Sequence, residues 1–352
     1  MKKTISFIIL IAVLLGVLSM SGCKSYEGEI NVYNWGEFIS DGSEGTLDVI
    51  AEFEDRYNIK VNYTTYETNE EMYDILKSTN SSYDIVIPSD YMIGKLIEKG
   101  LVQKINFDNV PNYKNIMDSY KNLPFDPNNE YCVPYSAGIV AIVYNKNMIQ
   151  DNIDSYSAMW NEAYKGKILM IDNSRDAMAI AMLLKGITPD VVTKEDIDIA
   201  TSYLKEQKPF LKKYAMDQTF PEMENNQAAI AAYYAGDIVS MMGNNENLTY
   251  ALPKEGTNKF VDCMCIPTSS KNKELAEKFI NYMLEAEIAK ANAEYIGYST
   301  PNKAAFELLD DEIKSNELSY PSEEYMNKCF YFSNLPDDVY EYMQEMYLQA
   351  KN

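Results

Sequence analysis

Aromatic side chains and carboxylates occur together at several points where a predicted strand or helix ends. The groups are Trp35–Glu37–Phe38, Asn173–Asp176, Tyr233–Tyr234–Asp237 and Phe260–Asp262. A buried ammonium group loses its hydration, which is costly unless carboxylates accept its protons. An aromatic face beside the ammonium contributes a further ~0.5–2 kcal/mol, and flat apolar walls suit a methylene chain. These groups are therefore complementary to a linear organic cation with two or three charges.

Each pair, taken alone, also has a structural explanation. The chain contains 29 tyrosines, so a tyrosine beside an acid occurs often by chance. Single exposed aromatics and acids are common on protein surfaces. The binding-site interpretation depends on their joint placement at strand ends that face one cleft.

Strand and helix patterns alternate from residue 28 to residue 100. Strands are predicted at 28–35, 59–66 and 82–90, and helices at 46–58, 69–78 and 91–100. Asn69 is a candidate N-cap of the second helix, and Gly100 closes the third. This order predicts a mostly parallel sheet with helices on both faces.

Two strand ends in this region carry candidate ligand contacts. Ligands of open α/β sheets bind beyond the carboxyl ends of the strands, near the point where strand order reverses. Trp35 and Glu37 follow the first strand, and Ser89 and Tyr91 follow the third. We therefore expect these four side chains to face one crevice.

The second half of the chain predicts another α/β unit. Pro134 and Gly138 lie at the start of a long apolar strand that we interpret as the crossing into a second lobe. The later elements are a helix, a strand and a second helix within 155–186, an apolar element that ends at Tyr234, a returning strand within 258–270, and one amphipathic helix at 271–297. One lobe interrupted by another fits this order better than two consecutive domains.

The N-terminus has the layout of a secretory signal. Lys2 and Lys3 precede an apolar run at 5–20, and Ser21-Gly22-Cys23 resembles the bacterial lipobox, in which the cysteine is lipidated and becomes the new N-terminus. An ordinary cleaved signal with a nearby free cysteine is the alternative. We expect a signal peptide at 1–22 and a lipid anchor on Cys23, which would hold the protein at the outer face of the membrane or in the periplasm.

Charge and residue usage exclude several classes of function. Removal of residues 1–22 takes away two lysines and changes the net charge from −22 to −24, which disfavours nucleic acid and attracts cations. The chain contains no histidine, so histidine-dependent nucleophiles, general bases and zinc sites are excluded. No P-loop motif is present. We expect no metal and no cofactor.

The remaining cysteines favour buried thiols. They are Cys132, Cys263, Cys265 and Cys329. The second and third are two residues apart and share one face of a strand, which is poor geometry for a bond between them. Free thiols are therefore favoured over a disulfide framework.

Several stretches, in order, resemble a known family. They are NVYNWGEF, YETNEEMYDILK, YDIVIPSDYM, PFDPNNEYCVPY, YKGKILMIDNSRD, ALPKEGTNKFVDCMCIPTSSKNKE and IGYSTPN. The chain from about residue 29 to 350 is similar to the spermidine/putrescine-binding proteins of bacterial polyamine ABC importers. The resemblance implies an α/β protein with the two-lobed periplasmic-binding-protein fold (type II), each lobe a mostly parallel sheet flanked by helices. The expected lobes are 29–137 plus 258–302, and 138–257 plus 303–352.

The resemblance also implies which residues bind the ligand in the interlobe cleft. The aromatic wall falls on Trp35, Tyr91, Tyr234, Phe260 and Tyr298. Polar and further contacts fall on Glu37, Phe38, Ser89, Asn173, Asp176, Asp237 and Asp262.

Three positions depart from the family pattern. Gly36 stands where a polar side chain is expected, and Asn173 stands where an acid is expected. Asp237 matches an acid of putrescine-preferring relatives. No clear match to the C-terminal polar contact is found near 329–330. These changes would shorten the preferred ligand, but the sequence leaves the order of putrescine and spermidine open.

The expected function is capture of a polyamine and its delivery to a permease driven by a cytoplasmic ATPase. The protein is expected to be a monomer and not an enzyme. An alternative is the same fold with another ligand, such as an amino acid, which would need an arginine for its carboxylate, or a ferric ion, which would need clustered Tyr or His. A secreted hydrolase that uses Glu37 and Asp176 is a third hypothesis, but nothing fixes those acids at a catalytic separation.

Overall fold

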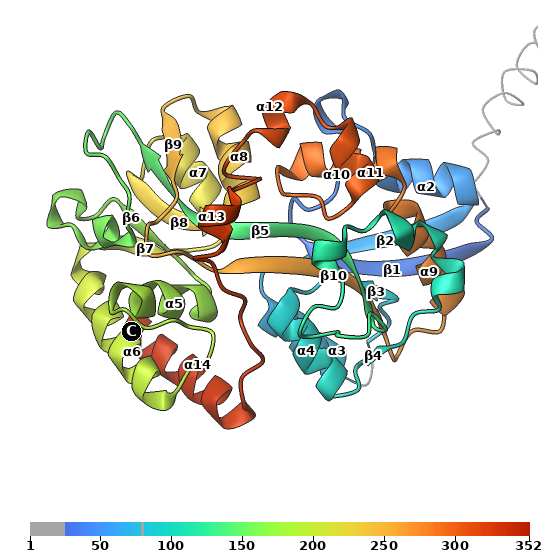
Figure 1. Cartoon of the computed structure of the whole chain (residues 1–352), viewed down its shortest axis with the longest axis horizontal. Coiled ribbons are helices and arrows are strands. Elements are labelled where there is room, and N and C mark those ends of the chain that lie inside the picture. The colour runs from blue at the N-terminus through green and yellow to red at the C-terminus, as the bar shows by residue number, and fades with distance from the viewer. Residues whose placement is uncertain (1–24, 79–80) are drawn as a thin grey trace, which may run out of the picture.

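The computed structural model describes residues 25–78 and 81–352 (Figure 1). The predicted signal peptide and Cys23 lie outside these residues. Within the described residues, no helix is both long enough and apolar enough to cross a membrane.

One mixed sheet runs through the molecule in the order β2-β1-β3-β10-β5-β8-β6-β7. Its strands are β1 (Gly28–Trp35), β2 (Ile59–Tyr66), β3 (Ile85–Val86), β5 (Cys132–Asn145), β6 (Ile168–Ile171), β7 (Leu211–Ala215), β8 (Ile230–Tyr234) and β10 (Lys259–Pro267), with β4 (Val102–Gln103) beside β10 and β9 (Leu248–Ala251) beside β5. Strands β1, β2 and β3 are parallel, as are β6, β7 and β8. The long strands β5 and β10 are antiparallel to each other and join the two halves (Figure 1).

Helices cover both halves of the sheet. Around β1–β3 lie α2 (Val49–Tyr57), α3 (Asn69–Lys77), α4 (Asp90–Glu98), α9 (Lys273–Met283) and α10 (Ala286–Ile296), which we call the first lobe. Around β6–β8 lie α5 (Ser174–Leu184), α6 (Lys194–Gln207), α7 (Thr219–Glu224), α8 (Ala235–Asn244) and α14 (Asp337–Lys351), which we call the second lobe. The first lobe has two buried apolar clusters and the second lobe has one. This arrangement confirms the predicted α/β class.

The C-terminal segment reaches both lobes. Helix α11 (Lys303–Leu308) packs on α10, whereas α14 packs on α5 and α6. Between them lie α12 (Asp311–Lys314) and α13 (Glu323–Met326). At the start of α14, Asp337 Oδ2 pairs with Lys99 Nζ at 2.7 Å, which ties this segment to the end of α4.

Local capping explains one error of the sequence analysis. The N-cap of α3 is Thr68, whose side chain accepts from the Glu71 amide, and not Asn69. Threonine is, like asparagine, a preferred N-cap residue, although a somewhat weaker one, and Thr68 has the extended backbone that precedes a helix. Asn69 is left free to accept from the Ser89 amide at 3.2 Å and to donate to the Tyr91 hydroxyl at 3.2 Å. It therefore supports two predicted site residues.

Three other element predictions need correction. The helix expected at 271–297 breaks after Met283, because the backbone of Glu285 is extended (φ −63°, ψ 139°). The Leu284 carbonyl accepts a hydrogen bond from Asn302 Nδ2. The helix expected early in 155–186 is two short 3-10 turns, Tyr156–Trp160 and Glu162–Tyr164. Helix α2 begins at Val49 because Asp48 caps it. The strands at 28–35 and 59–66 are confirmed.

The four described cysteines are buried and unbonded. Cys132 on β5 is the direct cross-strand partner of Cys265 on β10. They belong to an apolar cluster of the first lobe together with Cys263. The thiols therefore act as small core side chains.

Candidate functional site

A cavity of about 690 Å³, part of it open to solvent, lies between the lobes. This size is typical of a small-molecule site. The predicted site residues that line it are Trp35, Phe38, Ser89, Tyr91, Asn173, Asp176, Tyr234, Asp237, Phe260, Asp262 and Tyr298. Both lobes and the connecting strand β10 contribute to this set, so the structure brings together residues that are far apart in the sequence.

The strand topology explains why these residues meet. Trp35 ends β1, Ser89 is the N-cap residue of α4 after β3, Asn173 caps α5 after β6, and Tyr234 ends β8. All four therefore lie at the carboxyl ends of parallel strands, where ligands of α/β sheets bind.

Glu37 lies apart from this group. Its side chain is exposed, its backbone is left-handed (φ 51°), and it is not among the cavity-lining residues. The preceding residue, Gly36, does line the cavity. A ligand contact for Glu37 stays a prediction.

Asp262 is the most enclosed carboxylate on the β10 side of the cavity. Its side chain is 3% exposed, and its Oδ1 accepts from the Ser89 hydroxyl at 2.7 Å. Burial raises the pKa of Asp262 to about 7, although the hydrogen bond from Ser89 opposes this shift. The carboxylate is therefore short of a positive partner.

Asp176 lies in the first turn of α5 and is also 3% exposed. Each of its oxygens has a protein donor, because Tyr234 Oη donates to Oδ2 at 3.0 Å and Asn258 Nδ2 donates to Oδ1 at 3.1 Å. Burial raises the pKa of Asp176 to about 6 in spite of these donors. Asn173 uses its Oδ1 to cap the same helix.

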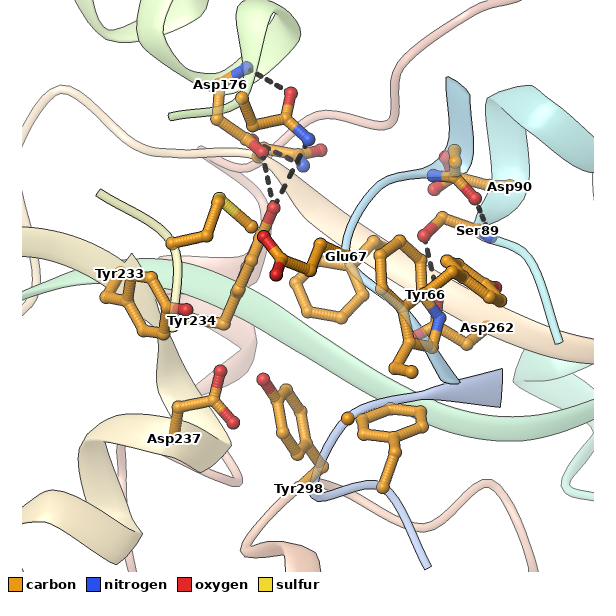
Figure 2. A pocket seen from close by; sticks show the side chains of 18 of the residues that line it. Tyr66, Glu67, Ser89, Asp90, Asp176, Tyr233, Tyr234, Asp237, Asp262 and Tyr298 are labelled. Carbon is orange, nitrogen blue, oxygen red and sulfur yellow. Dashed lines mark hydrogen bonds between the residues drawn. The ribbon is translucent and has the colours of Figure 1, made fainter. Parts of the chain in front are cut away.

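Asp237, in the first turn of α8, is the third deep acid. Burial raises its pKa to about 8, opposed by a hydrogen bond from Tyr298 and reinforced by the charges of Asp217, Glu37 and Asp262. Figure 2 shows Asp176, Asp237 and Asp262 on different sides of the cavity. We call these three residues the deep acids.

Aromatic rings form the walls between the deep acids. The ring centroids of Trp35 and Tyr66 are 4.5 Å apart. The rings of Tyr234 and Phe260 pack edge to face, with their centroids 5.6 Å apart. Tyr298 packs so closely on Gly236 that an added Cβ there would lie 2.0 Å from its ring. A larger residue at 236 would displace this wall.

Arg175 lies behind the wall and does not line the cavity. Its guanidinium carbon is 4.7 Å from the Tyr91 ring and 4.5 Å from the Phe332 ring, and Nη2 donates to the Ser333 carbonyl at 2.9 Å. The side chain is 3% exposed. Among the described residues that line the cavity there is no lysine and no arginine, so this lining carries negative charge without a basic partner.

Eight lining residues escaped the sequence analysis. They are Tyr66, Glu67, Asn69, Asp90, Met216, Asp217, Asn258 and Phe332. Tyr66 and Glu67 could have been found, because they stand at the end of the predicted strand 59–66. Phe332 lies close to the C-terminal position where no polar match was found, and it contributes a ring instead. Asp217 and Asn258 carry no local signal.

No group of three or more His, Cys, Asp or Glu among the described residues is arranged to hold a metal ion. The charged side chains of the lining are carboxylates, and they lie among aromatic rings and a few neutral polar groups.

The sequence matches the family described as bacterial extracellular solute-binding protein over residues 48–320. The chain belongs to this family. This solute-binding protein is 32% identical over 335 residues to the spermidine/putrescine-binding periplasmic protein of Salmonella typhimurium, with 94% of each chain covered. It is 28% identical to the putrescine-binding periplasmic protein SpuD of Pseudomonas aeruginosa, with 92% of each covered.

A solved structure supports the same fold. The spermidine/putrescine ABC transporter substrate-binding protein of Streptococcus pneumoniae superposes with a TM-score of 0.78 at 32% identity, covering 92% of this solute-binding protein and 98% of that chain. The two-lobed fold implied by the family resemblance is therefore confirmed.

Proposed function

We propose that this solute-binding protein captures polyamines, putrescine and spermidine among them, and delivers them to an ABC importer. The observation that carries the proposal is the set of three deep acids in an aromatic cavity whose described lining includes no basic residue. The relatives from Salmonella typhimurium and Pseudomonas aeruginosa support the proposal, because their names describe them as binding polyamines.

Each part of a polyamine has a chemical counterpart in the cavity. A charge-assisted hydrogen bond between an ammonium and a carboxylate contributes roughly 1.5–3 kcal/mol, and Asp237 and Asp262 have acceptor capacity that the protein does not use fully. The rings of Trp35, Tyr234 and Phe260 offer apolar faces to the methylene stem. The deep acids thus hold the ends, and the rings hold the stem.

Binding and lobe closure are linked in this proposal. The lining residues come from both lobes, so a bound cation contacts both at once only in the closed arrangement. A ligand shifts a conformational equilibrium by its difference in affinity for the two states. Closure would then signal to the permease that the protein is loaded.

The protein would work outside the cytoplasm, held by a lipid on Cys23, as a monomer and without catalysing a reaction. The position of Arg175 supports a cation over an amino acid, because its guanidinium faces Tyr91 and Phe332 and not the cavity. The position of Glu37 outside the lining speaks against an acid pair with Asp176.

A thermal-shift panel tests the proposal on the mature protein. A ligand that binds only the folded state raises the melting temperature by an amount that grows with the logarithm of its concentration relative to its dissociation constant. Putrescine and spermidine should raise it, whereas amino acids and sugars at the same concentration should not. A shift with an amino acid or a sugar and none with either polyamine would refute the proposal.

A further inference from the structure

Two further carboxylates lie at the open end of the cavity, one on each lobe. Glu67 directly follows β2 in the first lobe, and Asp217 follows β7 in the second. Both line the cavity and both are exposed. Figure 2 shows Glu67 within the same cavity as the deep acids. We call Glu67 and Asp217 the mouth pair.

Asp217 approaches the first lobe at Gly36. A Cβ added to Gly36 would lie 3.8 Å from Asp217 Oδ2, in ordinary van der Waals contact. The carboxylate of the second lobe therefore lies close to a position of the first lobe that carries no side chain. The family resemblance leads us to expect a polar side chain at residue 36. In this protein the oxygen near that position is Asp217 Oδ2, which comes from the opposite lobe and belongs to a carboxylate.

Neither carboxylate of the mouth pair has a hydrogen-bond or ion-pair partner among the described residues. The nearby lysines Lys212 and Lys213 pair with Glu222 instead. Burial and the charge of Asp217 raise the pKa of Glu67, and burial raises the pKa of Asp217. Two like charges thus face one cavity from opposite lobes without a compensating cation.

The deep acids and the mouth pair differ in how many hydrogen-bond donors the protein supplies to their carboxylate oxygens. Asp176 already has a protein donor on each oxygen, whereas Asp262 has a donor on one oxygen only. Asp237 has the Tyr298 hydroxyl as its protein donor. A diamine can therefore be held by Asp237 and Asp262, and it leaves the mouth pair uncompensated.

We propose that the mouth pair, Glu67 and Asp217, accepts a third ammonium group and so makes the cavity favour triamines over diamines. This inference rests on the proposed function. The third ammonium would lie between the lobes, where it removes the repulsion between the two carboxylates and stabilises closure. The pair would also restore the countercharge that is absent at Asn173.

The size of the effect is limited by exposure. Exposed ion pairs contribute about 0.2–1 kcal/mol and are screened by salt, which corresponds to a change of up to about fivefold in affinity. The mouth pair would therefore set preference between ligands and not the ability to bind at all.

Titration calorimetry on the isosteric variant Asp217→Asn tests the inference, with spermidine and putrescine as ligands at low salt. The dissociation constant for spermidine should rise about three- to fivefold, while that for putrescine changes by less than about 1.5-fold. Glu67→Gln should also raise the dissociation constant for spermidine. The double variant should raise it by less than the product of the two single fold-changes. The spermidine effect should shrink at high salt.

Asp154→Asn is the matched control, because it also removes one negative charge from the surface of the second lobe, where Asp154 pairs with Lys254 and does not line the cavity. It should change neither constant. Equal changes for both amines in Asp217→Asn, or no change in either, would overturn the inference. If the unsubstituted protein binds neither amine, the proposed function itself fails, which is a separate result.

Discussion

The two sides of Tyr91 differ in how completely their charges are matched. On the rear side, the hydroxyls of Tyr91 and Tyr340 both donate to Glu70 Oε1, at 3.0 and 3.2 Å, and Lys95 Nζ lies 3.8 Å from the Tyr340 ring. Arg175 covers the Tyr91 ring. On the cavity side, the carboxylates have neutral donors or none.

This difference indicates what each side does. The rear side joins α3 and α4 to α14 and Arg175 with its own positive charges, so it needs no ligand. The cavity side concentrates acids that desolvation disfavours in their charged form. A bound cation would supply to the cavity side the positive charge that Lys95 and Arg175 supply to the rear side.

The largest effect is expected from pH, because it acts on more than one deep acid. Burial raises the pKa of Asp262 to about 7 and that of Asp237 to about 8 in the empty cavity. A bound ammonium favours the ionised carboxylate, so binding displaces protons below these values. Affinity should fall about tenfold per pH unit for each proton displaced as the pH decreases from 8 to 6.

Calorimetry in two buffers of different ionisation enthalpy measures this proton release directly. The heats should differ at pH 7, and the difference should shrink as the pH rises towards 8.5, because more of the deep acids are then ionised without ligand while the amines still carry most of their protons. Identical heats in both buffers at pH 7 would mean that the deep acids are ionised without ligand, and the contrast with the rear side would lose its basis.

Asp262→Asn is expected to give the largest effect of a single substitution. The amide keeps the shape and can still accept from Ser89, but it lacks the charge that an ammonium requires. Polyamine affinity should fall by more than about tenfold, consistent with a charge-assisted bond of roughly 1.5–3 kcal/mol. Ser89→Ala, which leaves the carboxylate and removes only its neutral donor, should cost less. Parental affinity in Asp262→Asn would show that the site is misplaced.

Trp35→Ala should weaken binding to a comparable or slightly smaller extent, because it removes an apolar wall and leaves the acids in place. The other tryptophan is a natural control. Trp160 stacks on Tyr203 at 4.7 Å in the second lobe and does not line the cavity. Trp160→Ala should lower the melting temperature without changing the dissociation constant, and the reverse pattern would contradict the assignment.

The sequence predicted the parts of the site that depend on one strand end. Trp35 and Ser89 follow their strands, and the topology brings them to the same edge of the sheet. The grouping of aromatics with acids pointed to Asn173, Asp176, Tyr234 and Asp237 of the second lobe, and the family resemblance then gave them ligand-binding roles. Neither the strand-end pattern nor the family resemblance identified Asp217. Its proximity to Gly36 of the other lobe can be recognised only in the folded structure.

Caps and breaks were the weaker part of the fold prediction. Thr68 and Asn69 are both good N-cap residues, so composition could not decide between them, and tertiary hydrogen bonds to Ser89 and Tyr91 engage the second. The break at Glu285 likewise depends on a tertiary contact, because Asn302, which donates to the Leu284 carbonyl, lies beyond the whole of α10 in the chain. The periodic strands needed no such information and were correct.

The smallest effect is expected on the rear side. Tyr340→Phe removes one hydroxyl from Glu70, which keeps the Tyr91 hydroxyl. The free energy of unfolding should fall by about 0.5–1.5 kcal/mol, and the dissociation constants of both amines should change by less than about twofold and in the same ratio. Denaturant unfolding and calorimetry measure the two quantities separately.

Tyr91→Phe removes a hydroxyl from the same carboxylate oxygen and keeps a ring in the cavity wall, but it also takes away the acceptor of Asn69 Nδ2. If the rear side is complete without ligand, both variants should leave the dissociation constants within about twofold of the parental values, and Tyr91→Phe should cost more stability because it breaks two hydrogen bonds. A tenfold loss of affinity in Tyr340→Phe would instead mean that the rear contacts form only when the cleft closes on its ligand. The rear side would then belong to the closure equilibrium, and the contrast between the two sides of Tyr91 would be one of distance from the ligand and not of charge balance.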